Sequence, residues 1–420
     1  MTLIIKNIKE LVQVEESPVL FRAGKEMQTL HTIKDAFLIV KEDKFFDFGS
    51  QTPENLQKIE KICKEDPQCK VIDAQGGMVF PSFCDSHTHI VYAGSREIEY
   101  IDKIKGLSYE EIAKRGGGIL NSADRLAETS EEELYETAME RLHEMASLGT
   151  GAVEIKSGYG LNTESELKML RVIRRLKENS NMIIKSNFLG AHAVPRNYIG
   201  KQNEYVDLII NEMIPVIAAE ELADFIDVFC DKGFFTVEET ERILMQGIKY
   251  GMRPKIHANE LDFSGGIQVG VKYNALSVDH LEFTGDEEIE ALLGSETMPT
   301  ILPGAAFFLE MAYAPARKMI EAGLPIALAS DYNPGSSPSG NMQFILSMGC
   351  IKYKMFPEEA INATTLNTAY AMGVNDIAGT IARNKIANFF ITKPIPSIEF
   401  MPYAFGSNKV AKAFLAGKEI

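Results

Sequence analysis

The sequence contains no tryptophan, few cysteines and no charge-free apolar run of membrane-spanning length. A membrane-spanning helix needs about 20 consecutive apolar residues, so an integral membrane protein is not expected. The five cysteines are scattered and include no Cys-x-x-Cys pair: Cys63, Cys69, Cys84, Cys230 and Cys350. An odd, scattered set of this kind predicts reduced thiols in a cytoplasm rather than a disulfide framework.

The sequence also has fewer basic residues than acidic ones. The 43 lysines and arginines face 59 acidic residues, which gives a formal net charge of -16 at pH 7. This balance, without any basic run, disfavours nucleic acid and membrane as partners. An anionic substrate would need a local arginine or backbone groups. The opening residues, Met-Thr-Leu-Ile-Ile-Lys, also lack the apolar core of a signal peptide, which again favours a cytoplasmic location.

From about residue 80 the chain alternates short apolar runs with helical patterns. We count eight candidate strands, at 78–84, 151–155, 182–189, 225–229, 254–256, 275–278, 299–302 and 326–329. Strands that alternate with helices favour a parallel sheet, and eight of them favour a closed (β/α)8 barrel of the TIM type. An open doubly wound sheet is the alternative. No Gly-x-Gly-x-x-Gly opens the first helix, which counts against dinucleotide binding.

The two ends of the chain have a different pattern, of short strands and polar turns. Strands are predicted near 3–5, 36–49 and 71–74, and again at 386–392 and 409–417. We expect residues 1–77 and 383–420 to form one small β-sandwich domain beside a catalytic barrel of residues 78–382. Inside the barrel, helix starts are predicted at the capping sequences 130–133, 163–166 and 236–239, and a helix over 204–219.

Polar residues recur where the candidate strands end, which is the catalytic end of such a barrel. They are His87 and His89 after the first strand, Tyr159 after the second, His192 after the third, His257 and Glu260 after the fifth, His280 after the sixth and Asp331 after the eighth. Each alone has a structural explanation, such as a satisfied core histidine or a helix cap. Five of the seven histidines in the sequence are expected at this end of the barrel, which favours a common metal site.

The residues that best suit a metal are His87, His89, His257 and Asp331. In a strand, His87 and His89 point to the same face. Three imidazoles and a carboxylate, with an open position for water, suit one Zn²⁺ or Fe²⁺ ion. Such an ion lowers the pKa of bound water towards about 7, so the set predicts a hydrolase.

The chain resembles the amidohydrolase superfamily. The motifs that carry the resemblance are His-Thr-His-Ile-Val-Tyr-Ala-Gly-Ser-Arg at 87–96, Gly-Gly-Gly-Ile at 116–119, Glu-Ile-Lys-Ser-Gly-Tyr-Gly-Leu at 154–161, Gly-Ala-His-Ala-Val-Pro at 190–195, Asp-Val-Phe-Cys-Asp at 227–231, His-Ala-Asn-Glu-Leu at 257–261 and Ser-Asp-Tyr-Asn-Pro-Gly-Ser at 330–336. The sequence departs from the usual pattern at Ser82, Asn384 and Asn388, which are expected to belong to the scaffold.

The motifs at 154–161 and 190–195 narrow the resemblance to enzymes of histidine degradation. It implies hydrolysis of a ring C–N bond of 4-imidazolone-5-propanoate to N-formimidoyl-L-glutamate. It further implies one Zn²⁺ or Fe²⁺/Fe³⁺ per chain, a homodimer and a structural Lys156, although some amidohydrolases bridge two metals with a carboxylated lysine. The implied substrate contacts are Arg96, Tyr159, His192, Glu260, Asn333, Gly335 and Ser336.

Two competing interpretations stay open at this point. One is another cyclic amidohydrolase or a heterocycle deaminase, against which Arg96, Tyr159 and His192 argue. The other is a non-catalytic relative, although no expected ligand is missing. The general base is also open among Glu260, His280 and Asp331. We favour His280 working with Glu260, because the charge of Asp331 as a ligand is drawn to the metal; the alternative is that Glu260 mainly holds the ring N–H.

Overall fold

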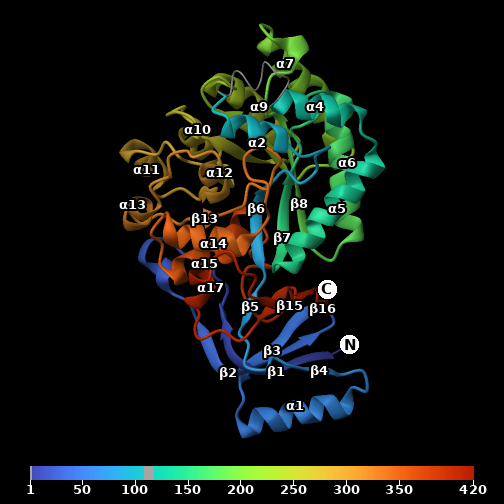
Figure 1. Cartoon of the computed structure of the whole chain (residues 1–420), viewed down its shortest axis with the longest axis vertical. Coiled ribbons are helices and arrows are strands. Elements are labelled where there is room, and N and C mark those ends of the chain that lie inside the picture. Colours follow the sequence, from blue (N-terminus) through green and yellow to red (C-terminus); the bar gives the residue numbers. More distant parts are fainter. Residues whose placement is uncertain (1, 108–117) are drawn as a thin grey trace.

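A computed structural model describes residues 2–107 and 118–420, and Figure 1 shows that they build a barrel above a smaller sheet. The barrel sheet has eight parallel strands in sequence order. They are β6 (Phe83–Thr88), β7 (Thr150–Lys156), β8 (Ile183–Ala191), β9 (Phe225–Cys230), β10 (Arg253–Ala258), β11 (Ser277–His280), β12 (Met298–Ile301) and β13 (Ala327–Leu328). This arrangement confirms the predicted (β/α)8 barrel.

The barrel closes between its first and last strands at the end where the predicted site lies. Thr88 forms a parallel bridge with Tyr332. The Asp331 N–H donates to the His87 carbonyl over 3.0 Å, and the His89 N–H donates to the Tyr332 carbonyl over 2.9 Å. The backbone bonds that close the barrel therefore also bring His87, His89 and Asp331 together.

Helices cover the outside of the barrel and fill the connections between its strands (Figure 1). Those between β6 and β9 are α2 (Glu97–Ile104), α4 (Ile119–Glu128), α5 (Glu131–Ser147), α6 (Thr163–Asn179), α7 (Gln202–Leu208) and α8 (Ile214–Ala219). Those that follow are α9 (Val237–Lys249), α10 (Gly266–Lys272), α11 (Asp286–Leu292), α12 (Pro303–Phe308), α13 (Ala316–Glu321), α14 (Met342–Ile351), α15 (Pro357–Thr364) and α16 (Leu366–Ala371). The predicted Gly-rich motif at 116–119 lies partly outside the described residues.

Two of the three predicted helix caps hold. The Thr236 cap is a full capping box with Glu239, and Ser130 accepts from the Glu133 N–H at 3.2 Å. The helix start predicted at 163–166 is confirmed, because α6 begins at Thr163, but the predicted cap is wrong. Asn162 caps α6 by accepting from the Ser165 N–H at 2.9 Å. The expected capping glutamate, Glu166, is turned inward to hold the loop that follows β7.

The helix predicted over 204–219 is present but interrupted. A π-helical turn, Ile209–Met213, separates α7 from α8. Pro215 stands in the first turn of α8 and has no N–H to donate to the carbonyl four residues earlier. A π-helical turn is often found where a helix lacks one of its backbone hydrogen bonds, so the turn before Pro215 is consistent with this missing donor.

The two ends of the chain meet in one β unit, as predicted, and its strands form a single second sheet where a β-sandwich was expected. Its order is β16-β15-β14-β5-β1-β2-β3, with β4 paired to β1. The strands are β1 (Thr2–Val12), β2 (Thr32–Lys41), β3 (Lys44–Ser50), β4 (Lys70–Asp73), β5 (Val79–Pro81), β14 (Phe389–Thr392), β15 (Val410–Leu415) and β16 (Lys418–Glu419). Helices α1 (Pro53–Glu65) and α17 (Phe400–Tyr403) accompany them, and both chain ends lie at one side of the sheet (Figure 1).

The strand predicted at 78–84 divides between the two sheets. β5 pairs with β1 and β14 in the terminal sheet, whereas β6 begins the barrel. Ser82 stands between them and donates its N–H to the Asn388 carbonyl at 3.0 Å. The predicted domain boundary at 77/78 falls just before β5 and stays a prediction.

Two positions that depart from the superfamily pattern, Ser82 and Asn388, pack together at the junction of the sheets. The Asn388 side chain donates to the Gly151 carbonyl at 2.8 Å and accepts from the Ala416 N–H at 2.7 Å. A Cβ atom on Gly151 would lie 2.1 Å from Ser82 Oγ. Asn388 therefore links the barrel to the terminal sheet, far from the catalytic end.

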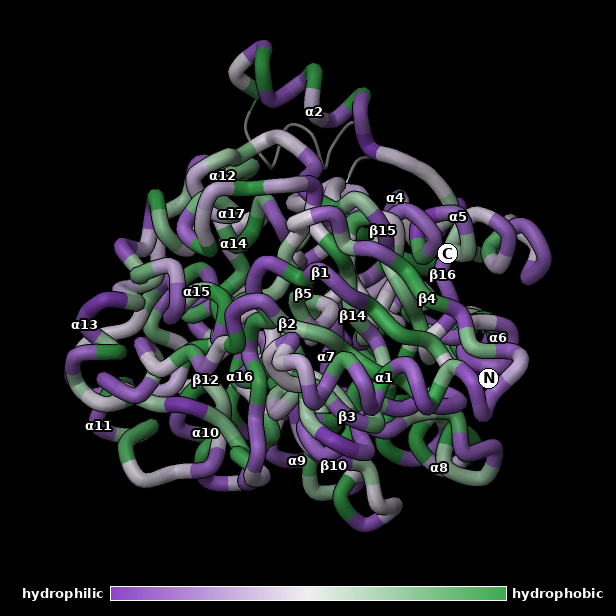
Figure 2. The backbone as a smooth tube through the Cα atoms, turned by 90° about the horizontal axis from the view of Figure 1, so that it is seen from below, coloured by the Kyte–Doolittle hydropathy of each residue, from purple (hydrophilic) through white to green (hydrophobic). Residues whose placement is uncertain are grey.

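Apolar side chains form one large core between the barrel and its helices and a smaller core within the terminal sheet. Stacked rings of Phe389 and Phe414, 4.4 Å apart, belong to the smaller core. Figure 2 shows α2 at the edge of the molecule, and its Ile98, Ile101 and Ile104 side chains are exposed. Within the two described ranges, no helix has the length and apolar character needed to cross a membrane.

Candidate metal and substrate site

A cavity of about 390 Å³ lies at the C-terminal ends of the barrel strands. It is lined by nearly all of the residues singled out from the sequence: His89, Arg96, Tyr159, His192, His257, Glu260, His280, Asp331, Asn333, Gly335 and Ser336. His87 is fully buried beneath it. The structure therefore brings the predicted site residues into one place.

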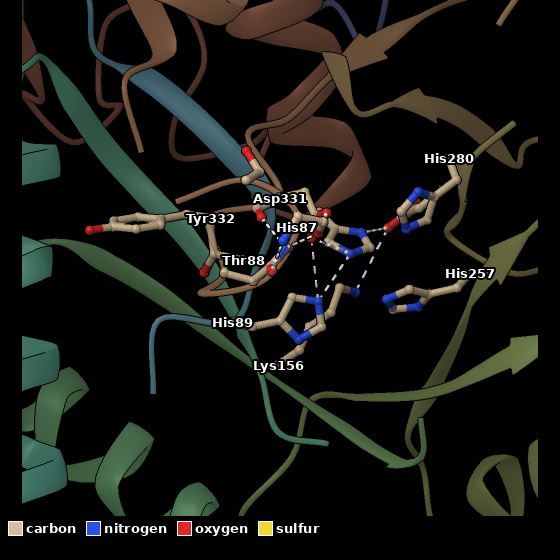
Figure 3. A network of polar contacts seen from close by, with 12 residues as sticks. His87, Thr88, His89, Lys156, His257, His280, Asp331 and Tyr332 are labelled. Carbon is tan, nitrogen blue, oxygen red and sulfur yellow. Dashed lines mark hydrogen bonds and ion pairs between the residues drawn. The ribbon is translucent and has the colours of Figure 1, made fainter. Parts of the chain in front are cut away.

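The predicted metal ligands converge below this cavity, as Figure 3 shows. His87 Nε2 lies 3.3 Å from His89 Nε2. Asp331 Oδ1 lies 3.6 Å from His87 Nε2 and 3.5 Å from His89 Nε2. The His257 ring centre is 4.4 Å from that of His87. The ligand atoms of His87, His89 and Asp331 all lie within 4.8 Å of one another, and so do those of His87, His257 and His280. His87 belongs to both groups, which suits a single ion bound at this position.

Two carboxylates orient the imidazoles from behind. Asp279 Oδ2 lies 2.6 Å from His87 Nδ1, and Asp227 Oδ1 lies 3.1 Å from His257 Nδ1. A proton on each Nδ1 leaves the Nε2 lone pair directed at the shared space. His257 Nε2 is buried and has no hydrogen-bond partner in the part of the chain described here. A cation at this position would satisfy that atom, so the residues present fit a metal.

The protonation states also suit a metal, because ligand imidazoles must be neutral. Burial lowers the pKa of His87 well below its ordinary value, and Lys156 lowers it further. Burial likewise lowers the pKa of His89, with His192 adding to the effect. Burial raises the pKa of Asp331 to about 6. A divalent cation beside that carboxyl group would favour its ionised form.

Beneath the histidines lies a fully buried network of charges. Lys156 Nζ donates to Glu154 and to Asp227, each at 2.7 Å, and Lys255 Nζ donates to Glu154 at 2.5 Å. Burial alone would lower the pKa of Lys156, but Asp227 and Glu154 raise it above its ordinary value. Carboxylation of a lysine requires its neutral amine, so this ion-paired ammonium favours a structural Lys156.

Arg96 lies at the other end of the cavity. Its Nε donates to Ser122 Oγ at 3.0 Å, and its guanidinium lies 5.9 Å from the Tyr159 ring. A Cβ atom on Gly335 would come within 2.2 Å of Arg96 Nη1, so this approach requires glycine. Within residues 2–107 and 118–420, the buried Nη2 atom has no hydrogen-bond partner. It is a donor available to an anionic group in the cavity.

The loop after β13 is organised by the side chain of Asn333. Its Oδ1 accepts from the N–H groups of Gly335 and Ser336, both at 2.8 Å, and its Nδ2 donates to the Asp331 carbonyl at 2.7 Å. The Ser336 hydroxyl donates to Asp331 Oδ2 at 3.1 Å. These three predicted substrate contacts line the cavity, but the Asn333 amide is already engaged within its own loop.

Tyr159 and His192 stand side by side between the metal ligands and Arg96. The Tyr159 loop is held by Glu166, which accepts from the N–H groups of Gly160 at 2.7 Å and Leu161 at 2.9 Å. Burial lowers the pKa of His192 to about 3. Its Nδ1 lies 3.0 Å from the Gly158 carbonyl, so Nδ1 carries the proton and Nε2 can accept a hydrogen bond.

Glu260 and His280 form a pair beside the metal ligands. Glu260 Oε2 lies 3.6 Å from His280 Nε2. Burial raises the pKa of Glu260 to about 8, whereas burial lowers that of His280 well below its ordinary value. Near neutral pH the glutamate therefore holds a proton and the imidazole is a neutral acceptor. His280 and Asp331 both have positive φ angles, of 86° and 54°, which indicates backbone strain at the site.

Sequence reasoning assigned no role to several residues that the structure places around the site. Asp227 and Asp279 orient the ligands, and the stacked rings of Phe229 and Phe234, 4.0 Å apart, line the cavity. The sequence did contain one signal, because Asp227 and Asp279 each lie within or beside a short apolar strand. Burying a carboxylate costs free energy unless it has a buried partner. The aromatic residues gave no signal that separates a cavity wall from ordinary core.

Comparisons with known proteins agree with this geometry. The sequence model of the Amidohydrolase family matches residues 255–420. The chain is 54% identical to the imidazolonepropionase of Christiangramia forsetii and 57% identical to that of Flavobacterium johnsoniae, with full coverage of both chains in each case. It is 41% identical to the imidazolonepropionase of Thermoanaerobacter pseudethanolicus, over 97% of this chain and 95% of that protein.

Solved structures with a similar fold are more distant in sequence. E. coli guanine deaminase superposes with a TM-score of 0.73 at 14% identity, over 100% of this chain and 99% of that one. An adenosine deaminase from Xanthomonas campestris with bound zinc gives a TM-score of 0.70 at 14% identity, over 99% and 92%. These two likenesses concern the fold alone.

Proposed function

The chain belongs to the imidazolonepropionase family of amidohydrolases, and we propose that the cavity described above is where it hydrolyses its substrate. The enzyme is a hydrolase of C–N bonds in cyclic amides. Its reaction converts 4-imidazolone-5-propanoate to N-formimidoyl-L-glutamate. The hydroxyl of water is added to the ring carbonyl carbon, the bond from that carbon to nitrogen breaks, and the nitrogen takes up a proton.

One observation carries the proposal: the cavity has a metal-binding set at one end and an anion-binding group at the other. The buried Nη2 of Arg96 lacks a hydrogen-bond partner among the described residues. Guanidinium groups recognise carboxylates strongly. An acidic protein with a net charge of -16 needs such a local cation to capture a carboxylate. The propanoate tail fits Arg96 while the ring lies over the ligand histidines.

We propose one Zn²⁺ or Fe²⁺/Fe³⁺ ion per chain, held by His87, His89, His257 and Asp331. Nitrogen and carboxylate donors suit either metal, and the buried Nε2 of His257, which no hydrogen bond satisfies within the described ranges, supports a cation there. A bound ion of this kind lowers the pKa of water and polarises a carbonyl oxygen. Elemental analysis of protein purified from its native source would identify the metal.

The protein groups have separate tasks in this proposal. His280, neutral and 3.6 Å from Glu260, accepts the proton of the attacking water. Glu260, protonated near neutral pH, donates a hydrogen bond to the departing ring nitrogen and supplies its proton. Asp331 serves chiefly as a ligand. Tyr159 and His192 line the path between the ligands and Arg96 and hold the ring in place.

A heterocycle deaminase is the second candidate, because guanine and adenosine deaminases share the fold. A purine has no carboxylate, so it would leave the buried Nη2 of Arg96 without a partner. The test is to incubate the purified, metal-loaded protein with 4-imidazolone-5-propanoate, guanine and adenosine in parallel. We expect formation of N-formimidoyl-L-glutamate and no ammonia from either purine. Release of ammonia from a purine would support the deaminase.

We also propose that the enzyme is a cytoplasmic homodimer. The resemblance to its family supports the dimer, and the cytoplasm is supported by the five cysteines, all of which are free thiols. Sedimentation equilibrium of the purified chain tests the dimer, and a single species of about 46.6 kDa would contradict it.

A further inference from the structure

His280 lies between two buried glutamates. Its Nε2 is 3.6 Å from Glu260 Oε2, and its Nδ1 is 3.9 Å from Glu282 Oε2. The contact between His280 Nδ1 and Glu282 depends on the backbone conformation, because both His280 and Leu281 have positive φ angles, of 86° and 72°. Two successive left-handed residues reverse the chain after β11 and return the Glu282 side chain to the imidazole. Such strain persists only where the surrounding structure maintains it.

Neither His280 Nδ1 nor the Glu282 carboxyl group has another hydrogen-bond partner among the described residues. His280 Nδ1 and both carboxyl oxygens of Glu282 are buried without a hydrogen bond to any other described residue. The side chain of Glu282 is only 1% exposed. A buried polar group that lacks a hydrogen-bond partner destabilises the fold. His280 Nδ1 is a donor position close to this carboxyl group that itself lacks a partner among the described residues.

The carboxyl group of Glu282 has a second buried polar neighbour besides His280. Burial raises the pKa of Glu282 well above its ordinary value, and the neighbouring Glu260 raises it further. Tyr353, which follows α14, is buried as well, and after burial the charge of Glu282 raises the pKa of its hydroxyl. Tyr353 Oη also lacks a hydrogen-bond partner among the residues that the structure describes. Glu282 is therefore buried near both a phenol and an imidazole.

We propose that Glu282 is a positioning residue that accepts the Nδ1–H of His280, across a closed gap or through one water molecule. This hydrogen bond fixes the tautomer in which His280 Nε2 is unprotonated and faces Glu260 and the cavity. The inference rests on the proposed role of His280 as proton acceptor. Without the hydrogen bond the proton can occupy Nε2, and the imidazole then has no lone pair for the reaction.

Nitrogen-15 NMR of the zinc-loaded protein labelled at histidine tests this assignment directly. The His280→Asn spectrum identifies the His280 signals by their loss. We expect a protonated Nδ1 and an unprotonated Nε2 in the wild type. We expect Glu282→Leu to lose this pattern and Glu282→Gln, whose amide oxygen can still accept, to keep it. The wild-type spectrum alone is decisive if Glu282→Leu fails to fold, because a protonated Nε2 overturns the proposal.

Steady-state kinetics with 4-imidazolone-5-propanoate provide the second measurement. Glu282→Leu should lose at least about tenfold in kcat with KM within about twofold, because substrate binding is not affected. Glu282→Gln should restore kcat to within about threefold of the wild type. A changed tautomer with normal kcat, or a lower kcat with an unchanged tautomer, contradicts the proposal. If the wild type does not turn over this substrate, the proposed function fails, while the NMR measurement still decides the role of Glu282.

Discussion

Asp279 holds His87 by a contact of 2.6 Å between Oδ2 and Nδ1, and this contact decides which nitrogen faces the metal site. Replacing Asp279 with Asn keeps the shape but allows the amide to donate to Nδ1, which favours the wrong tautomer. We expect Asp279→Asn to bind zinc about 10 to 100 times more weakly. Competition with a fluorescent chelator measures the affinity, and an unchanged value would mean that Asp279 does not orient the ligand.

The general base can be assigned by comparing two variants at equal metal content. We expect His280→Asn and Glu260→Gln both to retain one metal per chain, because neither residue is a proposed ligand. His280→Asn should lose at least about a hundredfold in kcat, the usual size of an acid–base contribution. A fully metallated His280→Asn protein with near-normal kcat would transfer the role to Glu260 or Asp331.

We expect substrate capture to depend on the planar fork of Arg96. Arg96→Lys keeps the charge but loses the paired donors, including the buried Nη2. We expect a higher KM, a lower kcat/KM and unchanged metal content. Arg174→Lys is the matched control, because the Arg174 guanidinium donates to the Glu220 carbonyl at 3.5 Å on the outside of the barrel. If kcat/KM is the same in Arg96→Lys and the control, Arg96 does not bind substrate.

Lys156 is expected to stabilise the barrel rather than to bridge metals. In Lys156→Ala, Glu154 and Asp227 lose a buried cation that lies 2.7 Å from each. Removal of one partner from a buried ion pair costs about 3–5 kcal/mol. Urea unfolding measures the loss, with the exposed Lys61→Ala as a control expected to change stability by less than about 1 kcal/mol. Two tightly bound metals in the wild type, one of them lost in Lys156→Ala, would overturn this interpretation.

Asp224, at the end of the barrel opposite the site, makes a pH-dependent contribution to the stability of the fold. Burial would raise the pKa of Asp224, but Lys185 at 2.9 Å and the Ser186 N–H at 2.9 Å hold it below its ordinary value. A carboxyl group whose pKa is lower in the folded state stabilises the fold above its unfolded pKa, and this contribution is lost as pH falls through the folded pKa.

We therefore expect Asp224→Asn to be less stable than wild type by about 1.5–3 kcal/mol at pH 7, the usual range for hydrogen bonds to charged groups. The difference should shrink below about pH 4, where the unfolded carboxyl group takes up its proton. Urea unfolding at pH 7 and pH 3.5 checks this prediction. A difference that grows as the pH falls would have the wrong sign.

The sequence was most informative where periodicity and position agree. Eight apolar runs predicted the barrel, and the placement of His87, His257 and Asp331 after three of them predicted that these residues meet. That inference works because parallel strands of a closed barrel bring all their carboxyl ends to one face. The ligand roles themselves stay predictions until a metal is observed.

Features that depend on side-chain direction could not be predicted. Glu166 matched a capping sequence, but tertiary contacts with Gly160 and Leu161 turned it inward. The change of sheet at Ser82 depends on pairing with Asn388, a residue distant in sequence. The approach of Glu282 to His280 depends on two positive φ angles that no local motif announces. In each case a long-range contact or an unusual backbone conformation outweighed the local pattern.

We propose that one metal ion, held by His87, His89, His257 and Asp331, is required for ring opening. Zinc can be titrated into the metal-free enzyme while N-formimidoyl-L-glutamate formation from 4-imidazolone-5-propanoate is followed. We expect no product without metal and a linear rise that ends at one equivalent per chain. A rise that continues to two equivalents, or product formation by the metal-free protein, would show that the reaction does not depend on a single ion.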